Sequence, residues 1–256
     1  GVRPWNILTI TFTNKAADEL KNRLVTKLGM EAQDVFASTF HSMCVRILRR
    51  DAEAIDLPKS FTIYDTDDSL RVVKKCLKNL NMEEKQFPPK PLLGAISHAK
   101  ERLESPQDMA DLADRNGDYR MKITARVYAA YQKELHEAGA LDFDDLLCET
   151  VRLFKTKPEV LEYYQNRWQY IMVDEYQDTN HVQYMLVAML AKKNKNLCVV
   201  GDDDQSIYRF RGADITNILN FEKDFKNTKI IKLEENYRST QNILDAANNV
   251  IKNNMG

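Results

Sequence analysis

One stretch of the sequence, residues 170–178, constrains the fold of this chain more than any other. Four mostly apolar residues at 170–173 run directly into a cluster of carboxylates. An apolar run this short, bounded by charge, is typical of a strand buried in a parallel sheet. Asp174 and Glu175 then emerge at the carboxyl end of the strand, where open α/β sheets bind their ligands. The stretch therefore predicts an α/β fold with a ligand site at one edge of its sheet.

Asp174 and Glu175 suit the chemistry of nucleoside triphosphate hydrolysis. A carboxylate at position 174 can hold Mg²⁺, which keeps several waters and binds through few protein oxygens. Its neighbour at position 175 can orient or deprotonate an attacking water. A strand that ends in a solvated acidic turn has the same sequence pattern, so these two residues alone leave both interpretations open.

Short apolar runs alternate with stretches of helical spacing in the first and last parts of the chain. This alternation predicts a parallel sheet with helices on both faces. The predicted strands are 7–12, 34–38, 170–173, 197–200 and 229–233. One predicted helix carries an apolar stripe that we assign to the core, formed by Val182, Met185, Leu186, Met189 and Leu190.

The middle of the chain has a different pattern, because strand-like runs disappear between residues 64 and 140 and helical spacing dominates. We expect an all-helical subdomain at 61–140, inserted into an α/β domain that residues 1–60 and 141–256 form together. Where the chain returns, residues 141–146 predict a helix start with an acidic first turn, a stabilising arrangement without a catalytic role.

A second strand end carries polar groups after the apolar run 197–200. Gly201 permits a tight turn, three aspartates at 202–204 can position metal or water, and Gln205 can donate a hydrogen bond to a terminal phosphate. An acidic surface turn is the competing interpretation.

The next segment interleaves aromatic and arginine side chains. Tyr208 and Phe210 alternate with Arg209 and Arg211. Single-stranded nucleic acid binding uses this combination, since bases stack on rings while guanidinium groups meet phosphates. Cation–π packing within a loop is the alternative.

A third polar turn, at 236–239, follows the predicted strand 229–233. Arg238 is placed to reach a γ-phosphate as an arginine finger, and Tyr237 to stack on a purine. An ordinary strand-to-helix turn capped by Ser239 would have the same sequence.

Charge and cysteine usage limit the partners of the chain. A net charge of −1 excludes global attraction to nucleic acid, so such binding requires a local basic groove. The four cysteines are far apart in sequence, which is typical of reduced thiols in a cytoplasmic protein. No apolar run approaches membrane-spanning length, so we expect no membrane partner.

Together these motifs resemble the UvrD/PcrA-type superfamily 1A DNA helicases. The resemblance covers nearly the whole chain and rests, in order, on 12–17, 39–42, 141–145, 174–178, 201–212 and 236–239. It implies a RecA-like P-loop NTPase core (domain 1A) with an inserted helical domain (1B). It also implies a bacterial ATP-dependent 3′-to-5′ helicase and translocase, acting on single-stranded DNA and single-strand/duplex junctions in repair or replication.

The resemblance further implies roles for individual residues. Asp174 would hold Mg²⁺ and Glu175, beside the metal, would activate water. Gln205 and Arg238 would contact the γ-phosphate of ATP, with Tyr237 against the adenine. The implied DNA-binding residues are Phe12, Asn14, Thr39, His41, Tyr208, Phe210 and Arg211. The family usually has Trp at position 210, so the smaller Phe210 is expected to keep the stacking contact in weaker form.

One expected element is absent from the sequence. A Walker A loop needs two glycines at a fixed spacing and a lysine directly after the second. No two glycines here have that spacing, and no glycine precedes a lysine. We therefore expect a fragment of a longer protein that lacks the P-loop and the second motor domain and does not hydrolyse ATP alone.

Two other functions remain open at this stage. A metal-dependent nuclease would use the carboxylates at 174, 175, 178 and 202–204 in a two-metal cluster, but leaves Gln205, Tyr237 and Arg238 without a role. A non-catalytic single-stranded DNA or protein binding module would use the helical segment 64–140 as a docking surface. For the helicase, repair or replication proteins are the expected protein partners.

Overall fold

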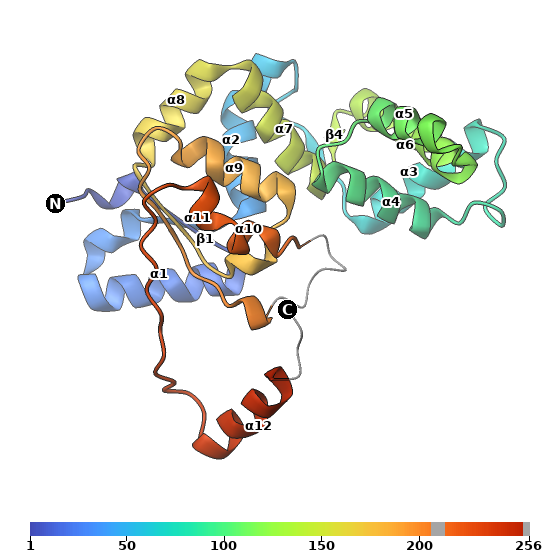
Figure 1. Ribbon diagram of the computed structural model, residues 1–256. Coiled ribbons are helices and arrows are strands. Elements are labelled where there is room, and N and C mark those ends of the chain that lie inside the picture. The colour runs from blue at the N-terminus through green and yellow to red at the C-terminus, as the bar shows by residue number, and fades with distance from the viewer. Residues whose placement is uncertain (206–212, 253–256) are drawn as a thin grey trace.

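A four-stranded parallel sheet lies at the centre of the larger domain (Figure 1). The computed structural model describes residues 1–205 and 213–252. The strand order is β2-β1-β5-β6, and each neighbouring pair is parallel. The strands are β1 (Ile7–Thr11), β2 (Phe36–Thr39), β5 (Tyr170–Val173) and β6 (Leu197–Val199). The α/β class with a parallel sheet, predicted from sequence, is confirmed.

The apolar residues of β1 and β5 explain why these two strands pair at the centre. Leu8 lies opposite Ile171, and Ile10 lies opposite Val173. All four side chains are at most 2% exposed. Because side chains alternate between the two faces of a strand, these residues share one face and contribute to a single core.

Helices cover both faces of the sheet, as the strand and helix alternation predicts (Figure 1). Helix α1 (Asn14–Leu28) packs on one face. The other face and the layer behind it contain α2 (Phe40–Asp51), α7 (Phe143–Thr156), α8 (Pro158–Arg167) and α9 (His181–Ala191). In α9, Val182, Leu186 and Leu190 are buried and both methionines of the predicted stripe pack against the same core.

The segment between β2 and β5 contains a second hydrophobic cluster, separate from the one beneath the sheet. Four helices build it: α3 (Thr66–Asn79), α4 (Pro89–Glu101), α5 (Pro106–Asn116) and α6 (Tyr119–Glu137). Figure 1 shows these helices beside the sheet domain. The exact boundaries at 60/61 and 140/141 stay a prediction.

A short two-stranded parallel sheet forms the neck between the two clusters. Strand β3 (Thr62–Ile63), where the chain leaves, pairs with β4 (Ala140–Leu141), where it returns. The neck also has the hydrogen bond from the N–H of Tyr64 to the carbonyl of Leu141, at 2.9 Å. The entry and exit of the helical segment are therefore adjacent.

The end of the described chain is built from short helices and exposed turns. They are α10 (Thr216–Leu219), α11 (Phe221–Asp224) and α12 (Gln241–Ile251). In α12 no described residue is buried. Across residues 1–205 and 213–252, no helix is both long and apolar enough to cross a membrane.

The predicted strand at 229–233 is wrong. The residues form neither a strand nor a helix, and Ile230, Ile231 and Leu233 are 61%, 70% and 84% exposed. Strand β6 is the last strand of the described sheet, and residues 229–233 do not pair with it. The sequence has strand propensity there, but a strand forms only with a hydrogen-bonded neighbour.

The carboxyl group of Asp144, in the first turn of α7, provides a test of the contact between α4 and α7. Ser97 of α4 donates a hydrogen bond to Asp144 Oδ2 at 2.7 Å. Burial, with a further contribution from the Asp142 charge, raises the pKa of Asp144 to about 6. The folded state therefore holds this proton more tightly than the unfolded state, and stability is lost as pH rises from the ordinary value of 3.8 to about 6.

We predict that Asp144→Asn becomes more stable relative to the parent chain as pH rises from about 4 to about 7.5, by on the order of 1–3 kcal/mol. The amide mimics the protonated acid and still accepts from Ser97, so the two chains should differ little at the lower pH. Urea unfolding across this range measures the difference. Asp67→Asn, at an exposed carboxylate of α3, is the control. A difference independent of pH would contradict the burial of Asp144.

Candidate functional site

The parallel sheet brings the polar ends of its four strands to one edge. Residues after β1 and β2 lie at the same edge as the turns that follow β5 and β6. The N–H of Asp174 donates to the carbonyl of Ile10 at 3.0 Å, which joins the end of β5 directly to the end of β1. The edge therefore has two neighbouring parts, a cavity at β1 and β2 and an acidic pair of turns at β5 and β6.

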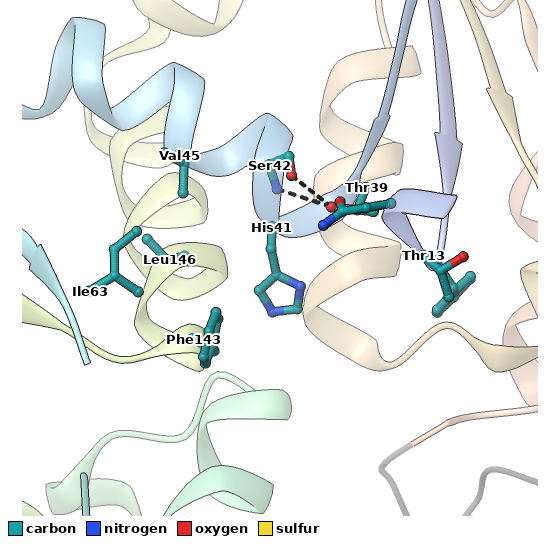
Figure 2. A pocket seen from close by; sticks show the side chains of 10 residues that line it. Thr13, Thr39, His41, Ser42, Val45, Ile63, Phe143 and Leu146 are labelled. Atoms are coloured by element: carbon teal, nitrogen blue, oxygen red, sulfur yellow. Dashed lines mark hydrogen bonds between the residues drawn. The ribbon is translucent and has the colours of Figure 1, made fainter. Parts of the chain in front are cut away.

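The cavity has a volume of about 520 Å³ and gathers several residues predicted to bind DNA (Figure 2). Its lining comes from the ends of β1 and β2, the beginnings of α1, α2 and α7, and strand β3. The lining residues are Phe12, Thr13, Asn14, Thr39, His41, Ser42, Val45, Ile63, Phe143 and Leu146. The four described residues that sequence analysis assigned to DNA, Phe12, Asn14, Thr39 and His41, are all among them.

Two threonine caps fix the backbone around the cavity. Thr13 Oγ1 accepts from the N–H of Ala16 at 3.1 Å and starts α1. Thr39 Oγ1 accepts from the N–H of Ser42 at 3.2 Å and starts α2, as the dashed lines in Figure 2 show. The cavity is therefore bordered by two helix N-termini, whose free N–H groups and dipoles favour a negatively charged ligand.

Aromatic rings form another part of the cavity wall. His41 meets Phe143 edge to face, with ring centroids 5.7 Å apart (Figure 2). Burial lowers the pKa of His41, so the ring is neutral at pH 7 and can stack without carrying charge. Phe12 is supported from behind by Phe40, at 5.8 Å. An apolar wall beside two helix N-termini suits a ligand with flat rings and an anionic backbone.

Phe143 is a cavity residue that sequence analysis missed. The segment 141–146 predicted only an acidic helix start, and Asp142 and Asp145 do form a capping box there. Phe143 lies between them and is 48% exposed. The available signal was a large aromatic residue in an otherwise acidic first turn, where burial in the core was not required.

The acidic turn after β5 is held by a local hydrogen bond and a sharp change of backbone direction. Asp174 Oδ1 accepts from the N–H of Glu175 at 3.0 Å. Glu175 has a left-handed backbone, with φ of 50°, which turns the chain sharply at the strand end. Burial raises the pKa of Asp174. Burial and then the charge of Glu175 raise the pKa of Asp178.

A buried amide connects this turn to the turn after β6. Gln177 is 1% exposed. Its Nε2 donates to Glu175 Oε2 at 2.8 Å, while its Oε1 accepts from the N–H of Asp202 at 3.1 Å. Asp202 Oδ2 in turn accepts from Gln205 Nε2 at 2.7 Å. Hydrogen bonds therefore link two residues predicted to be catalytic, Glu175 and Gln205, and sequence analysis gave no role to Gln177.

None of the described contacts joins the predicted site residues Tyr237 and Arg238 to this edge. Tyr208, Phe210 and Arg211 lie outside the described residues. Tyr237 is 86% exposed and donates a hydrogen bond to Glu235, two residues away. The N–H of Arg238 donates to Asn236, also within the same turn. Of the three polar turns predicted to follow strands, those after β5 and β6 lie at this edge, whereas the turn at 236–239 does not follow a strand because residues 229–233 do not join the sheet.

The carboxylates at the edge fit a metal that needs few protein ligands. In the part of the chain that the structure describes, no three His, Cys, Asp or Glu side chains are grouped so as to hold a metal ion. Mg²⁺ in phosphate sites is bound through one or two carboxylates, with water and phosphate oxygens completing the shell. Asp174, exposed at the end of β5, is a suitable ligand of that kind.

The close approach of the two turns predicts a penalty for Gly201→Ala. A Cβ at this position would lie 2.6 Å from Gln177 Oε1 and 2.7 Å from Ile218 Cδ1. We expect a loss of stability of about 1–3 kcal/mol, the usual cost of overpacking, measured by urea unfolding. Gly94→Ala in α4 is the matched control, since a Cβ there meets nothing within 4 Å. It should be neutral or stabilising by up to about 1 kcal/mol. Equal effects of the two substitutions would refute the predicted clash.

Comparison with known proteins supports the resemblance found in the motifs. The family described as the UvrD/REP helicase N-terminal domain matches residues 1–226. Over 253 residues, 99% of this chain, identity is 58% to the ATP-dependent DNA helicase PcrA of Bacillus subtilis (strain 168). It is 57% to the PcrA proteins of Staphylococcus aureus (strain Mu50) and Staphylococcus epidermidis (strain ATCC 35984). The chain spans about a third, 34%, of the length of these relatives. The chain thus belongs to the UvrD/REP helicase N-terminal domain family.

Proposed function

We propose that this chain is part of an ATP-dependent DNA helicase that moves 3′ to 5′ along single-stranded DNA. The observation that carries the proposal is the shared sheet edge, where a ring-lined cavity at β1 and β2 adjoins the acidic turns at β5 and β6. The relatives that match over nearly the whole chain are named ATP-dependent DNA helicases. Because both parts belong to one edge of the sheet, a structural change in the acidic turns at the nucleotide can be transmitted to the cavity that binds DNA.

The acidic turns form the nucleotide half of the proposed site. Asp174 holds Mg²⁺, which when bound supplies charge neutralisation at the phosphates of ATP. Glu175 orients and deprotonates the attacking water, and Gln205 donates to the γ-phosphate. Arg238 and Tyr237 reach the γ-phosphate and the adenine in the whole protein, whose P-loop we place outside this chain.

The cavity forms the DNA half. Phe12, His41 and Phe143 offer ring faces and edges to bases, and the N-termini of α1 and α2 offer N–H groups to phosphates. Thr13 and Thr39 position those N–H groups, and Asn14 lies beside them in the cavity lining. We assign Tyr208, Phe210 and Arg211 to further contacts along the DNA strand. Single-strand/duplex junctions are the proposed substrate, with repair or replication proteins as partners.

The hydrogen bonds at the edge provide a route between the two halves. Asp174 is bonded through its backbone to Ile10, two residues before Phe12. Gln177 joins Glu175 to Asp202, which precedes Tyr208 by six residues in the sequence. A shift of either acidic turn would therefore move residues of the DNA path through bonded neighbours.

The other functions considered from sequence have less support. A nuclease needs a cluster of carboxylates around two metals, and the described carboxylates do not form one. A non-catalytic binding module remains the proposal for this chain in isolation, since the groups that cradle the triphosphate are outside it.

We predict that Phe143→Ala weakens binding of this chain to a single-stranded oligonucleotide of about 20 nucleotides by about 5- to 150-fold, the equivalent of about 1–3 kcal/mol per stacked base. Fluorescence anisotropy at constant salt measures the affinity. Tyr119→Ala, which removes a 66% exposed ring on α6, is the control and should change the affinity little. Equal losses for both substitutions would remove the cavity from the DNA path.

We predict that this chain does not hydrolyse ATP, with or without single-stranded DNA.

In the whole protein, Glu175→Gln should lower kcat by about 10²–10⁴-fold, the usual contribution of a general base, while the chain still folds. Phosphate release measures both. DNA-stimulated turnover by the 256-residue chain, or an unchanged kcat for Glu175→Gln, would contradict the assignment.

A further inference from the structure

A fully buried lysine joins the helical segment to the sheet domain. Lys100, in the last turn of α4, is 1% exposed. Its ammonium lies 2.6 Å from Asp142 Oδ2 and 2.7 Å from Asp145 Oδ1, both at the start of α7. In the part of the chain that the structure describes, these are the ion pairs in which both side chains are less than 10% exposed.

Each of the two carboxylates uses one oxygen to hold α7 and the other to hold Lys100. Asp142 Oδ1 accepts from the N–H of Asp145 at 2.8 Å, and Asp145 Oδ2 accepts from the N–H of Asp142 at 3.2 Å. The first turn of α7 is therefore closed by the same side chains that bind α4. Breaking the ion pairs by removing Lys100 would leave two buried charges without a partner.

Helix α6 completes the network. Tyr131 Oη donates to Asp142 Oδ2 at 2.8 Å, and Gln132 Nε2 donates to Asp145 Oδ1 at 3.1 Å. Although burial alone lowers the pKa of Lys100, the charges of Asp145 and Asp142 outweigh it and raise the pKa, so the side chain is a cation. Lys100 is thus a fixed charge, and the neutral side-chain donors to the two carboxylates, Tyr131 and Gln132, both come from the helical segment.

The first turn of α7 presents a second set of residues to the cavity. Asp142 and Asp145 face the helical segment, whereas Phe143 and Leu146, each one position later, line the cavity. Residues three apart lie on one side of a helix, so the two pairs occupy adjacent sides of the same turn. A rotation of this turn would displace Phe143 from His41.

We propose that Lys100 is a positioning residue that holds the first turn of α7, so that Phe143 lies against His41 and the orientation of the helical segment sets the shape of the cavity. The link to DNA rests on the proposed function. The mechanical link between α4 and α7 is independent of the proposed function, so the link to DNA and the mechanical link are tested separately.

The first test uses Asp145→Asn, which removes one anchor but leaves the balanced pair of Lys100 and Asp142. Affinity for a labelled oligothymidylate of about 20 nucleotides is measured in the parent and in Phe143→Ala. We expect Asp145→Asn to weaken binding about 3- to 10-fold in the parent, in the range of coupled neighbours, and to have almost no effect in Phe143→Ala. The same loss in both backgrounds would overturn the proposal.

Two further variants separate positioning from stability. Lys100→Met should weaken binding more than Asp145→Asn, with the same dependence on Phe143, at a temperature where circular dichroism shows it folded. Lys75→Met removes an exposed ion pair with Glu134 inside the helical segment and should leave binding unchanged. If Lys75→Met weakens binding as much as Asp145→Asn, any lost charge pair has this effect and Lys100 holds no special position.

The second test needs no DNA. Spin labels on α5 and α8, in a chain with Cys198 replaced by Ser, report the distance between the two domains. We expect a narrow distance distribution that broadens in Asp145→Asn and stays narrow in Lys75→Met. Broadening without any DNA binding by the parent would support the link from α4 to α7 and refute the proposed function. An unchanged distribution in Asp145→Asn would refute the positioning role.

Discussion

Parallel pairing of β5 with β1 is the interaction on which the rest of the structure depends. The register that places Ile10 opposite Val173 also places Asp174 next to the end of β1. Residues more than 150 positions apart in sequence thereby become neighbours at one edge. A parallel sheet gives every strand the same direction, so polar groups that follow the strands gather without any further constraint. The two halves of the candidate site are a consequence of strand direction.

Strand pairing brings the turns close together, and buried polar groups then fix their relative positions. Gln177 loses its water and regains hydrogen bonds to Glu175 and to the backbone of Asp202, while Lys100 does the same with two carboxylates. Such groups contribute little net stability, because desolvation offsets most of the interaction energy. What they exclude is any alternative arrangement that leaves them unpaired. Both networks therefore specify geometry at the two places where turns from different segments meet.

Local patterns in the sequence predicted what local chemistry determines. The apolar runs at β1 and β5 and the acidic start of α7 follow from short-range preferences, and they are observed. The partners of Gln177 and Lys100 depend on contacts across many residues, so no periodicity reveals them. At residues 229–233 the sequence pattern predicted a strand that the structure does not contain. Their composition favours a strand, yet pairing is decided by the neighbour and not by the segment itself.

The short neck between the two clusters explains why Lys100 can have a large effect on the orientation of the helical segment. A parallel pair of two-residue strands, β3 and β4, has few hydrogen bonds, and alone it would allow the helical segment to rotate about it. Packing of α4 on α7 restricts this rotation, but apolar contacts are non-directional and tolerate sliding. Two ion pairs between Lys100 and the cap of α7 are directional. They convert a flexible insertion into an element whose orientation is coupled to Phe143 and hence to the cavity.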